Sequence, residues 1–169
     1  MTKKRIILTL SLPFIMVIVL MLPGVGTNKS KAWDGSGEGT KENPWVFDYC
    51  EGYFDNKDES LHFKGNCEGA LYVYNNDISA FKDIKDQVKT IYFDGVNWFY
   101  SDYVSIKGKK DVRGAFEDFS QLESVVFSNV GNRILFGSET FKNCQSLKNV
   151  IILDKEIKLY VSDYAFEEC

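Results

Sequence analysis

The residues best suited to chemistry in this chain are four cysteines and one histidine. No two cysteines have the C-x-x-C spacing of a zinc or redox site, and a single histidine does not complete a zinc site with them. Nucleophilic catalysis of the Cys–His type would need Cys50 or Cys67 beside His62, and the sequence carries no local signature of such an enzyme. We therefore expect no metal, no cofactor and no catalytic residue, and we interpret the protein as a non-enzyme.

Carboxylates are numerous but scattered, and an acidic turn at Asp55, Asp58 and Glu59 is their densest group. A glycosidase needs two carboxyl groups about 5–10 Å apart, a separation that sequence does not fix. The Gly-rich stretch from Asp34 resembles the start of a calcium-binding loop, but its twelfth position is Trp45 where such a loop has glutamate. We interpret the carboxylates as a solvated acidic surface.

The N-terminal segment has the layout of an export signal. Three basic residues, 3–5, precede an apolar run from Ile6 to Leu22, and Ser30-Lys31-Ala32 supplies the small residues of a cleavage site before Trp33. We expect residues 1–32 to be a cleaved signal peptide and the protein to be secreted or at the cell surface. The alternative is an uncleaved membrane anchor, because the apolar run nearly reaches the ~20 residues of a membrane span.

Export changes what the cysteines and the charge imply. Outside the cytosol thiols can pair, so Cys50 and Cys67 are a candidate disulfide. Residues 1–32 hold five of the 20 basic residues and none of the 24 acidic ones, so the remainder has 15 basic residues and a net charge of −9. Such an acidic chain is not expected to bind nucleic acid or an anionic membrane, because like charges repel.

A repeat of 25 residues dominates the second half of the chain. Its copies start with AFEDFSQLESVVF at Ala115, TFKNCQSLKNVII at Thr140 and AFEEC at Ala165, and a degraded copy starts at Ala80. The L-x-x-V-x-F spacing and the period are those of leucine-rich repeats. The last two apolar residues lie two apart and so face one side of a strand, which predicts one strand per coil and a parallel sheet.

At these positions the sequence resembles the BspA-like leucine-rich repeats of bacterial surface proteins. The match is carried by Ala115-Phe116, Phe141-x-x-Cys144-x-x-Leu147 and Ala165-Phe166-x-x-Cys169, whereas Phe119 and Thr140 depart from the usual Cys and Ala. The resemblance covers residues 80–169 and implies an extracellular adhesion or interaction role without shared catalytic residues.

The predicted fold is α/β and strand-dominated: a short leucine-rich-repeat solenoid of about 25-residue coils behind an N-terminal β cap. The boundaries that we predict are 1–32 for the signal peptide, 33–79 for the cap, 80–114 for the degenerate coil, and 115–139, 140–164 and 165–169 for the remaining coils. Because the last copy is partial, we expect a truncated member or self-association through an uncapped C-terminal coil.

The predicted concave face of the sheet is the best candidate for a binding site. An apolar row of outward residues on such a face often marks a binding surface, although ordinary β-propensity gives the same pattern. The candidate residues are Tyr92, Ser124, Val126, Asn149, Ile151 and Leu153, and the expected ligand is a protein on a host or neighbouring cell. Cys144 and Cys169 occupy equivalent positions, and we expect them to stack as buried thiols, with a disulfide as the alternative.

The alternative function is a secreted carbohydrate-binding or hydrolytic protein that uses the aromatic-rich N-terminal half. Exposed aromatic rings could stack on sugars, whereas buried rings would only fill the cap. The aromatic residues concerned are Trp33, Trp45, Trp98, Tyr100 and Tyr103.

Overall fold

The structure is a computed structural model that describes residues 6–9, 36–47, 50–65, 70–73, 81–96, 98–101 and 114–169. For residues 6–9 and 70–73, and for residues 98, 100 and 101, the description covers the backbone alone.

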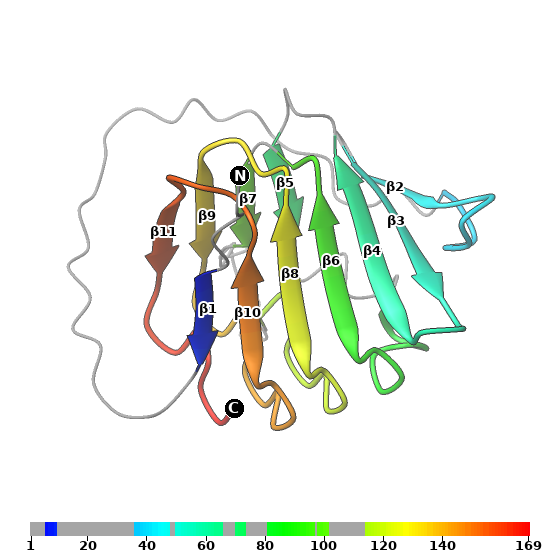
Figure 1. Cartoon of the computed structure of the whole chain (residues 1–169). Coiled ribbons are helices and arrows are strands. Elements are labelled where there is room, and N and C mark those ends of the chain that lie inside the picture. The colour runs from blue at the N-terminus through cyan, green and yellow to red at the C-terminus, as the bar shows by residue number, and fades with distance from the viewer. Residues whose placement is uncertain are drawn as a thin grey trace, which may run out of the picture.

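Two β-sheets make up the described fold (Figure 1). The seven-stranded sheet has the spatial order β1 (Ile6–Thr9), β10 (Asn149–Ile152), β8 (Ser124–Ser128), β6 (Thr90–Asp94), β4 (Ser60–Gly65), β3 (Cys50–Asp55) and β2 (Trp45–Phe47). The four-stranded sheet has the order β11 (Lys158–Val161), β9 (Arg133–Phe136), β7 (Trp98–Ser101) and β5 (Ala70–Val73).

Most strand pairs are parallel. The chain alternates between the sheets from β4 to β11, so each turn of the chain adds one strand to each sheet. Among the described strands, only β1 with β10, β2 with β3, and β3 with β4 are antiparallel. Helix is almost absent from the described residues. The strand-dominated fold with a mostly parallel sheet is therefore confirmed.

The second sheet is a feature that the sequence reading missed, because it assigned one strand to each coil. The signal was present in the repeat: Ile134 and Leu159 lie 25 positions apart, and so do Phe136 and Val161. The structure pairs both couples directly in the β9–β11 register. We call each turn of the chain, with its one strand in each sheet, a coil. The two strands of a coil thus cover the core from opposite sides.

The register of the seven-stranded sheet follows the repeat. Val125 lies opposite Val150, and Phe127 lies opposite Ile152. On the other side of β8, Val125 lies opposite Ile91. These positions are all buried, because side chains two apart on a strand point to the same face.

Phenylalanine ladders fill the space between the sheets. In one ladder the rings of Phe63, Phe93 and Phe127 stack with centroid separations of 5.0 and 4.7 Å. A second ladder follows the turns that precede the strands, and its rings are Phe81, Phe116, Phe141 and Phe166. A ring at the same place in each coil therefore packs on the ring of the coil before it, which gives the repeat its buried core.

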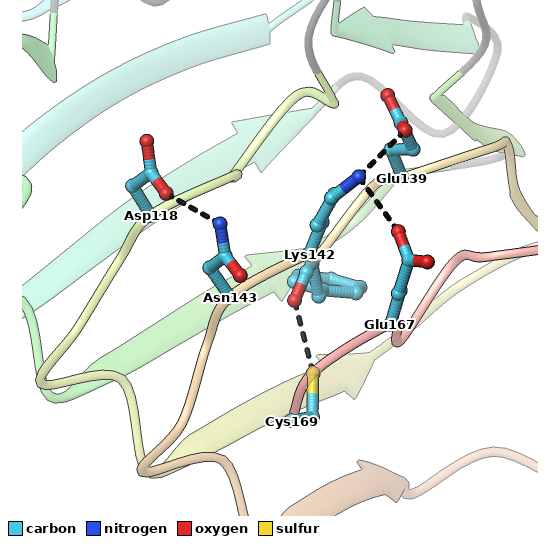
Figure 2. A network of polar contacts seen from close by, with 7 residues as sticks. Asp118, Glu139, Lys142, Asn143, Glu167 and Cys169 are labelled. Carbon is cyan, nitrogen blue, oxygen red and sulfur yellow. Dashed lines mark hydrogen bonds and ion pairs between the residues drawn. The ribbon is translucent and has the colours of Figure 1, made fainter.

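The turns between coils form their own ladder. Asp118 N–H donates to the Lys142 carbonyl at 2.9 Å. Figure 2 shows the Asn143 amide, which donates to the Asp118 carboxylate at 3.0 Å. Lys142 Nζ also forms ion pairs with Glu139 Oε1 at 3.0 Å and with Glu167 Oε2 at 2.6 Å. Asp118 and Asn143 are equivalent residues of two copies, and both have positive φ, 65° and 60°. The repeat thus fixes the turn conformation as well as the strands.

In the part of the chain that is described, no helix is long and apolar enough to cross a membrane. The apolar leader beyond Thr9 lies outside the described residues, so the predicted cleavage or anchoring remains a prediction.

Candidate ligand-binding face

The outer face of the seven-stranded sheet carries the candidate site. On β6 and β8 buried residues alternate with partly exposed ones, and the exposed set points away from the core. The strand register arranges these outward side chains in rows that cross the sheet.

We call the middle one the central row. Direct register partners on successive strands make it up: Tyr53 on β3, His62 on β4, Tyr92 on β6, Val126 on β8 and Ile151 on β10. Tyr53 is buried, and the other four are partly exposed. The row is aromatic on one side and aliphatic on the other, and it is continuous across five strands.

Polar residues flank the central row on both sides. The hydroxyl row consists of Ser60, Thr90, Ser124 and Asn149. The charged row consists of Lys64, Asp94 and Ser128, in which Ser128 donates to the Asp94 carboxylate at 3.0 Å. The face therefore has an apolar centre with polar edges.

The aromatic half of the central row is a stack of three rings. His62 lies between Tyr53, with a centroid separation of 4.7 Å and an interplanar angle of 7°, and Tyr92, at 4.9 Å and 15°. Both faces of the imidazole are thus covered by neighbouring rings. The imidazole therefore offers no open face on which a sugar could stack.

A Ser–His–Asp group lies beside this stack, but its order differs from that of a catalytic triad. Ser60 Oγ donates to the Asp58 carboxylate and lies 2.6 Å from His62 Nε2. In a triad the histidine stands between the acid and the serine, whereas here the serine stands in the middle. Ser60 is also only 1% exposed, so a substrate cannot reach its hydroxyl. The contact orients the His62 ring.

Burial lowers the pKa of His62, and the nearby Asp58 and Asp55 carboxylates oppose that shift. The neutral imidazole is therefore favoured near pH 7. Because Ser60 gives its hydrogen to Asp58, it accepts one from Nε2–H of His62, which selects that tautomer.

The structure places all six predicted face residues on this surface, where each is partly exposed. Tyr92, Val126 and Ile151 lie in the central row. Ser124 and Asn149 are adjacent in the hydroxyl row, and the Asn149 amide donates to Ser124 Oγ at 3.5 Å. Leu153 follows β10 directly, and its N–H donates to the Phe127 carbonyl at 3.0 Å. Their role in ligand binding remains a prediction.

Tyr53 and His62 are members that the sequence reading missed. They lie before the repeat, in the hairpin of β3 and β4, so the 25-residue period does not reach them. The available signal was the alternation of Leu61 and Phe63 with polar residues, which places His62 on the outward side.

The cysteines play a structural part among the described residues. Cys144 and Cys169 are free thiols and donate to the carbonyls of Phe116 and Phe141 in the preceding coil. Cys50 is likewise a free thiol in the structure. It is buried, and this burial raises the pKa of the Cys50 thiol. Cys67 lies outside the described residues, so the disulfide with Cys50 remains a prediction.

The aromatic residues of the carbohydrate alternative are described only in part. Trp45 is 7% exposed and packs edge-on against Phe81 at 5.4 Å, so it belongs to the core. Trp33, Tyr103 and the side chains of Trp98 and Tyr100 lie outside the description. Within the described ranges no group of three His, Cys, Asp or Glu side chains is arranged to hold a metal ion.

Comparisons with protein-family models, with curated proteins and with solved structures gave no match.

Proposed function

We propose that this protein is an exported, non-catalytic binding protein whose outer sheet face takes a protein ligand. The observation that carries the proposal is the central row, because five register partners form one continuous, largely apolar strip. A strip with polar edges matches the usual anatomy of a protein interface, which has an apolar core and a polar rim.

The ring stack favours a protein ligand over a sugar. Sugar binding by aromatic residues uses an open ring face, and both faces of the His62 ring are covered. The net charge of −9 outside the leader further favours a partner with a basic rim, because complementary charge speeds and orients association.

The assignment of the fold as a leucine-rich-repeat solenoid is part of the same proposal. From β4 to β11 the strands alternate between two sheets and pair in parallel within each, and the last strands keep the 25-residue register, which supports a short leucine-rich-repeat solenoid. The resemblance to BspA-like repeats supports a role in adhesion, and the leader supports export to the cell surface or the medium.

The test compares retention of the exported protein on purified extracellular proteins and on purified polysaccharides. Tyr92→Lys and Val126→Lys each place a charge in the central row, and we expect at least about tenfold weaker retention on the protein ligand. The matched control is Tyr160→Lys, because Tyr160 is an exposed tyrosine on β11 of the other sheet. We expect this control to bind normally, and circular dichroism checks that each variant is folded.

The opposite pattern would overturn the proposal. Retention on a polysaccharide that survives Tyr92→Lys and is lost with Trp98→Ala would support the carbohydrate alternative. Equal loss of protein binding in Tyr92→Lys and Tyr160→Lys would show that the central row is not the site.

A further inference from the structure

The edge of β10 accepts an antiparallel strand. β1 runs along it with Ile6 opposite Ile152, Ile7 opposite Ile151 and Leu8 opposite Val150 (Figure 1). These residues of β1 belong to the segment 1–32 that we expect to be removed on export. Removal of β1 would leave the main-chain N–H and C=O groups of the β10 edge unpaired, and such an edge readily pairs with another strand.

We propose that, once the leader is removed, β10 of a second copy takes the place of β1 and joins two copies edge to edge. The two β10 strands would run antiparallel to each other, and a twofold axis through Ile151 would relate the two copies. Antiparallel pairing of identical strands is self-complementary, as an isologous dimer requires.

The register of β10 suits this exchange. With Ile151 on the axis, Val150 lies opposite Ile152 of the second copy, and Ile152 lies opposite its Val150. Residues 152, 151 and 150 of β10 face Ile, Ile and Leu of β1 in the structure. In the proposed dimer the same three residues face Val, Ile and Ile of the second β10. Val150 and Ile152 are the buried residues of β10, so the pairing keeps inward side chains opposite inward ones.

The last coil, which contains β10, leaves further apolar surface exposed. Tyr164 in this coil is 65% exposed. Leu159, Val161 and Phe166 are only partly covered, although each packs against the core. A four-residue strand pair is small beside the roughly 1,200–2,000 Å² of a stable interface, and this apolar coil end supplies further area.

The proposed dimer would extend the ligand face. Ile151 ends the central row on β10, and pairing about Ile151 continues that row into the second copy. The inference rests on removal of the leader and stands apart from the proposed ligand, since its test uses no ligand.

The experiment expresses the full chain with its own leader and purifies the exported product. Intact mass shows whether residues 1–32 are gone, and light scattering after size exclusion gives the number of copies. We expect twice the chain mass for the unchanged protein. Ile151→Lys and Ile151→Glu place like charges opposite each other across the axis, so we expect each variant alone to have a single-chain mass.

Mixing the two variants is the decisive step. A lysine opposite a glutamate is favourable, so an equal mixture should return to the double mass, which misfolded variants could not do. Val126→Lys is the control, because it alters the same row on the interior strand β8 and should remain dimeric. The proposal is overturned by an exported product that retains residues 1–32, by a monomeric unchanged protein, by variants that stay dimeric alone, or by a mixture that stays monomeric.

Discussion

Cys144 donates its thiol hydrogen to the main-chain carbonyl oxygen of Phe116, 3.2 Å away and 28 residues earlier in the chain. Cys169 repeats the contact with Phe141 at 3.0 Å. A small side chain that can donate thus ties each of these coils to the coil before it, while the rings of Phe116 and Phe141 stack beside the contact. This explains why cysteine recurs three residues after the phenylalanine.

Removal of this thiol should destabilise the fold. We expect Cys144→Ala to lower the free energy of unfolding by about 1–3 kcal/mol, because the Phe116 carbonyl loses its thiol donor and a small cavity opens. Urea denaturation measures the change. Cys169→Ala is the matched control, and it should cost less because Cys169 is partly exposed. An equal or larger loss at Cys169 would contradict this account.

The same thiols should make the folded protein less stable at alkaline pH. Burial raises the pKa of Cys144 from 9.0 to about 12, and burial also raises the pKa of Cys169. The unfolded thiol loses its proton near pH 9 while the folded thiol keeps it, so this contribution to stability is complete below pH 9 and declines from there toward pH 12. We expect the unfolding free energy to fall between pH 8 and pH 10, and to fall less in Cys144→Ala. Equal slopes for the two proteins would refute the assignment.

How far the sequence predicts this fold depends on which contacts are periodic. The L-x-x-V-x-F spacing predicts the register of β8 and β10, because Val125 and Val150 each follow the same turn by the same number of residues. The second sheet was missed because its period is regular only from β9 to β11. Trp98 lies opposite Arg133 in the β7–β9 register, a separation of 35 residues where the repeat has 25.

The candidate site divides in the same way. Within the central row, Val126 and Ile151 follow from the 25-residue period, whereas Tyr92 lies 34 residues before Val126 and follows from the apolar spacing of the degraded copy. The rest of the row depends on the β3–β4 hairpin joining β6 in parallel, which is a tertiary contact without periodicity. The pairing of β1 with β10 was likewise beyond the sequence, since the leader reads as an export signal and its strand pairing depends on an edge formed elsewhere.

His62 offers a direct measurement, because the chain contains one histidine. Its imidazole gives a single set of NMR signals, and we expect the titration midpoint to lie below the ordinary value of 6.5, since burial between Tyr53 and Tyr92 disfavours the charged ring. A midpoint at or above 6.5 would show that the carboxylates of Asp55 and Asp58 outweigh burial.

Because the pKa of His62 is lowered, we expect acid to lower the free energy of unfolding. The unfolded chain binds a proton near pH 6.5 that the folded chain resists, so the stabilisation is complete above that pH and declines as the pH falls through the lower folded value. Unfolding free energies at pH 5, 6 and 7 should therefore decline more steeply in the unchanged protein than in His62→Phe. The phenylalanine keeps a ring between the two tyrosines and removes the titration, so parallel curves would contradict the argument.

Gly114 shows how close the coils approach. A Cβ placed on Gly114 would lie 1.4 Å from the carbonyl oxygen of Glu139, its equivalent in the next coil, so the backbone itself would have to move. We expect Gly114→Ala to lower the free energy of unfolding by about 2–3 kcal/mol, as overpacking does in a filled core. Glu139→Gly is the opposing control. Glu139 has φ 58°, a conformation that glycine adopts without strain, and the variant loses only the ion pair with Lys142, so its free energy of unfolding should change by no more than about 1 kcal/mol. Urea denaturation of both variants separates the two causes, because a close approach penalises only the added Cβ, whereas a general need for the native residue in this turn would penalise both.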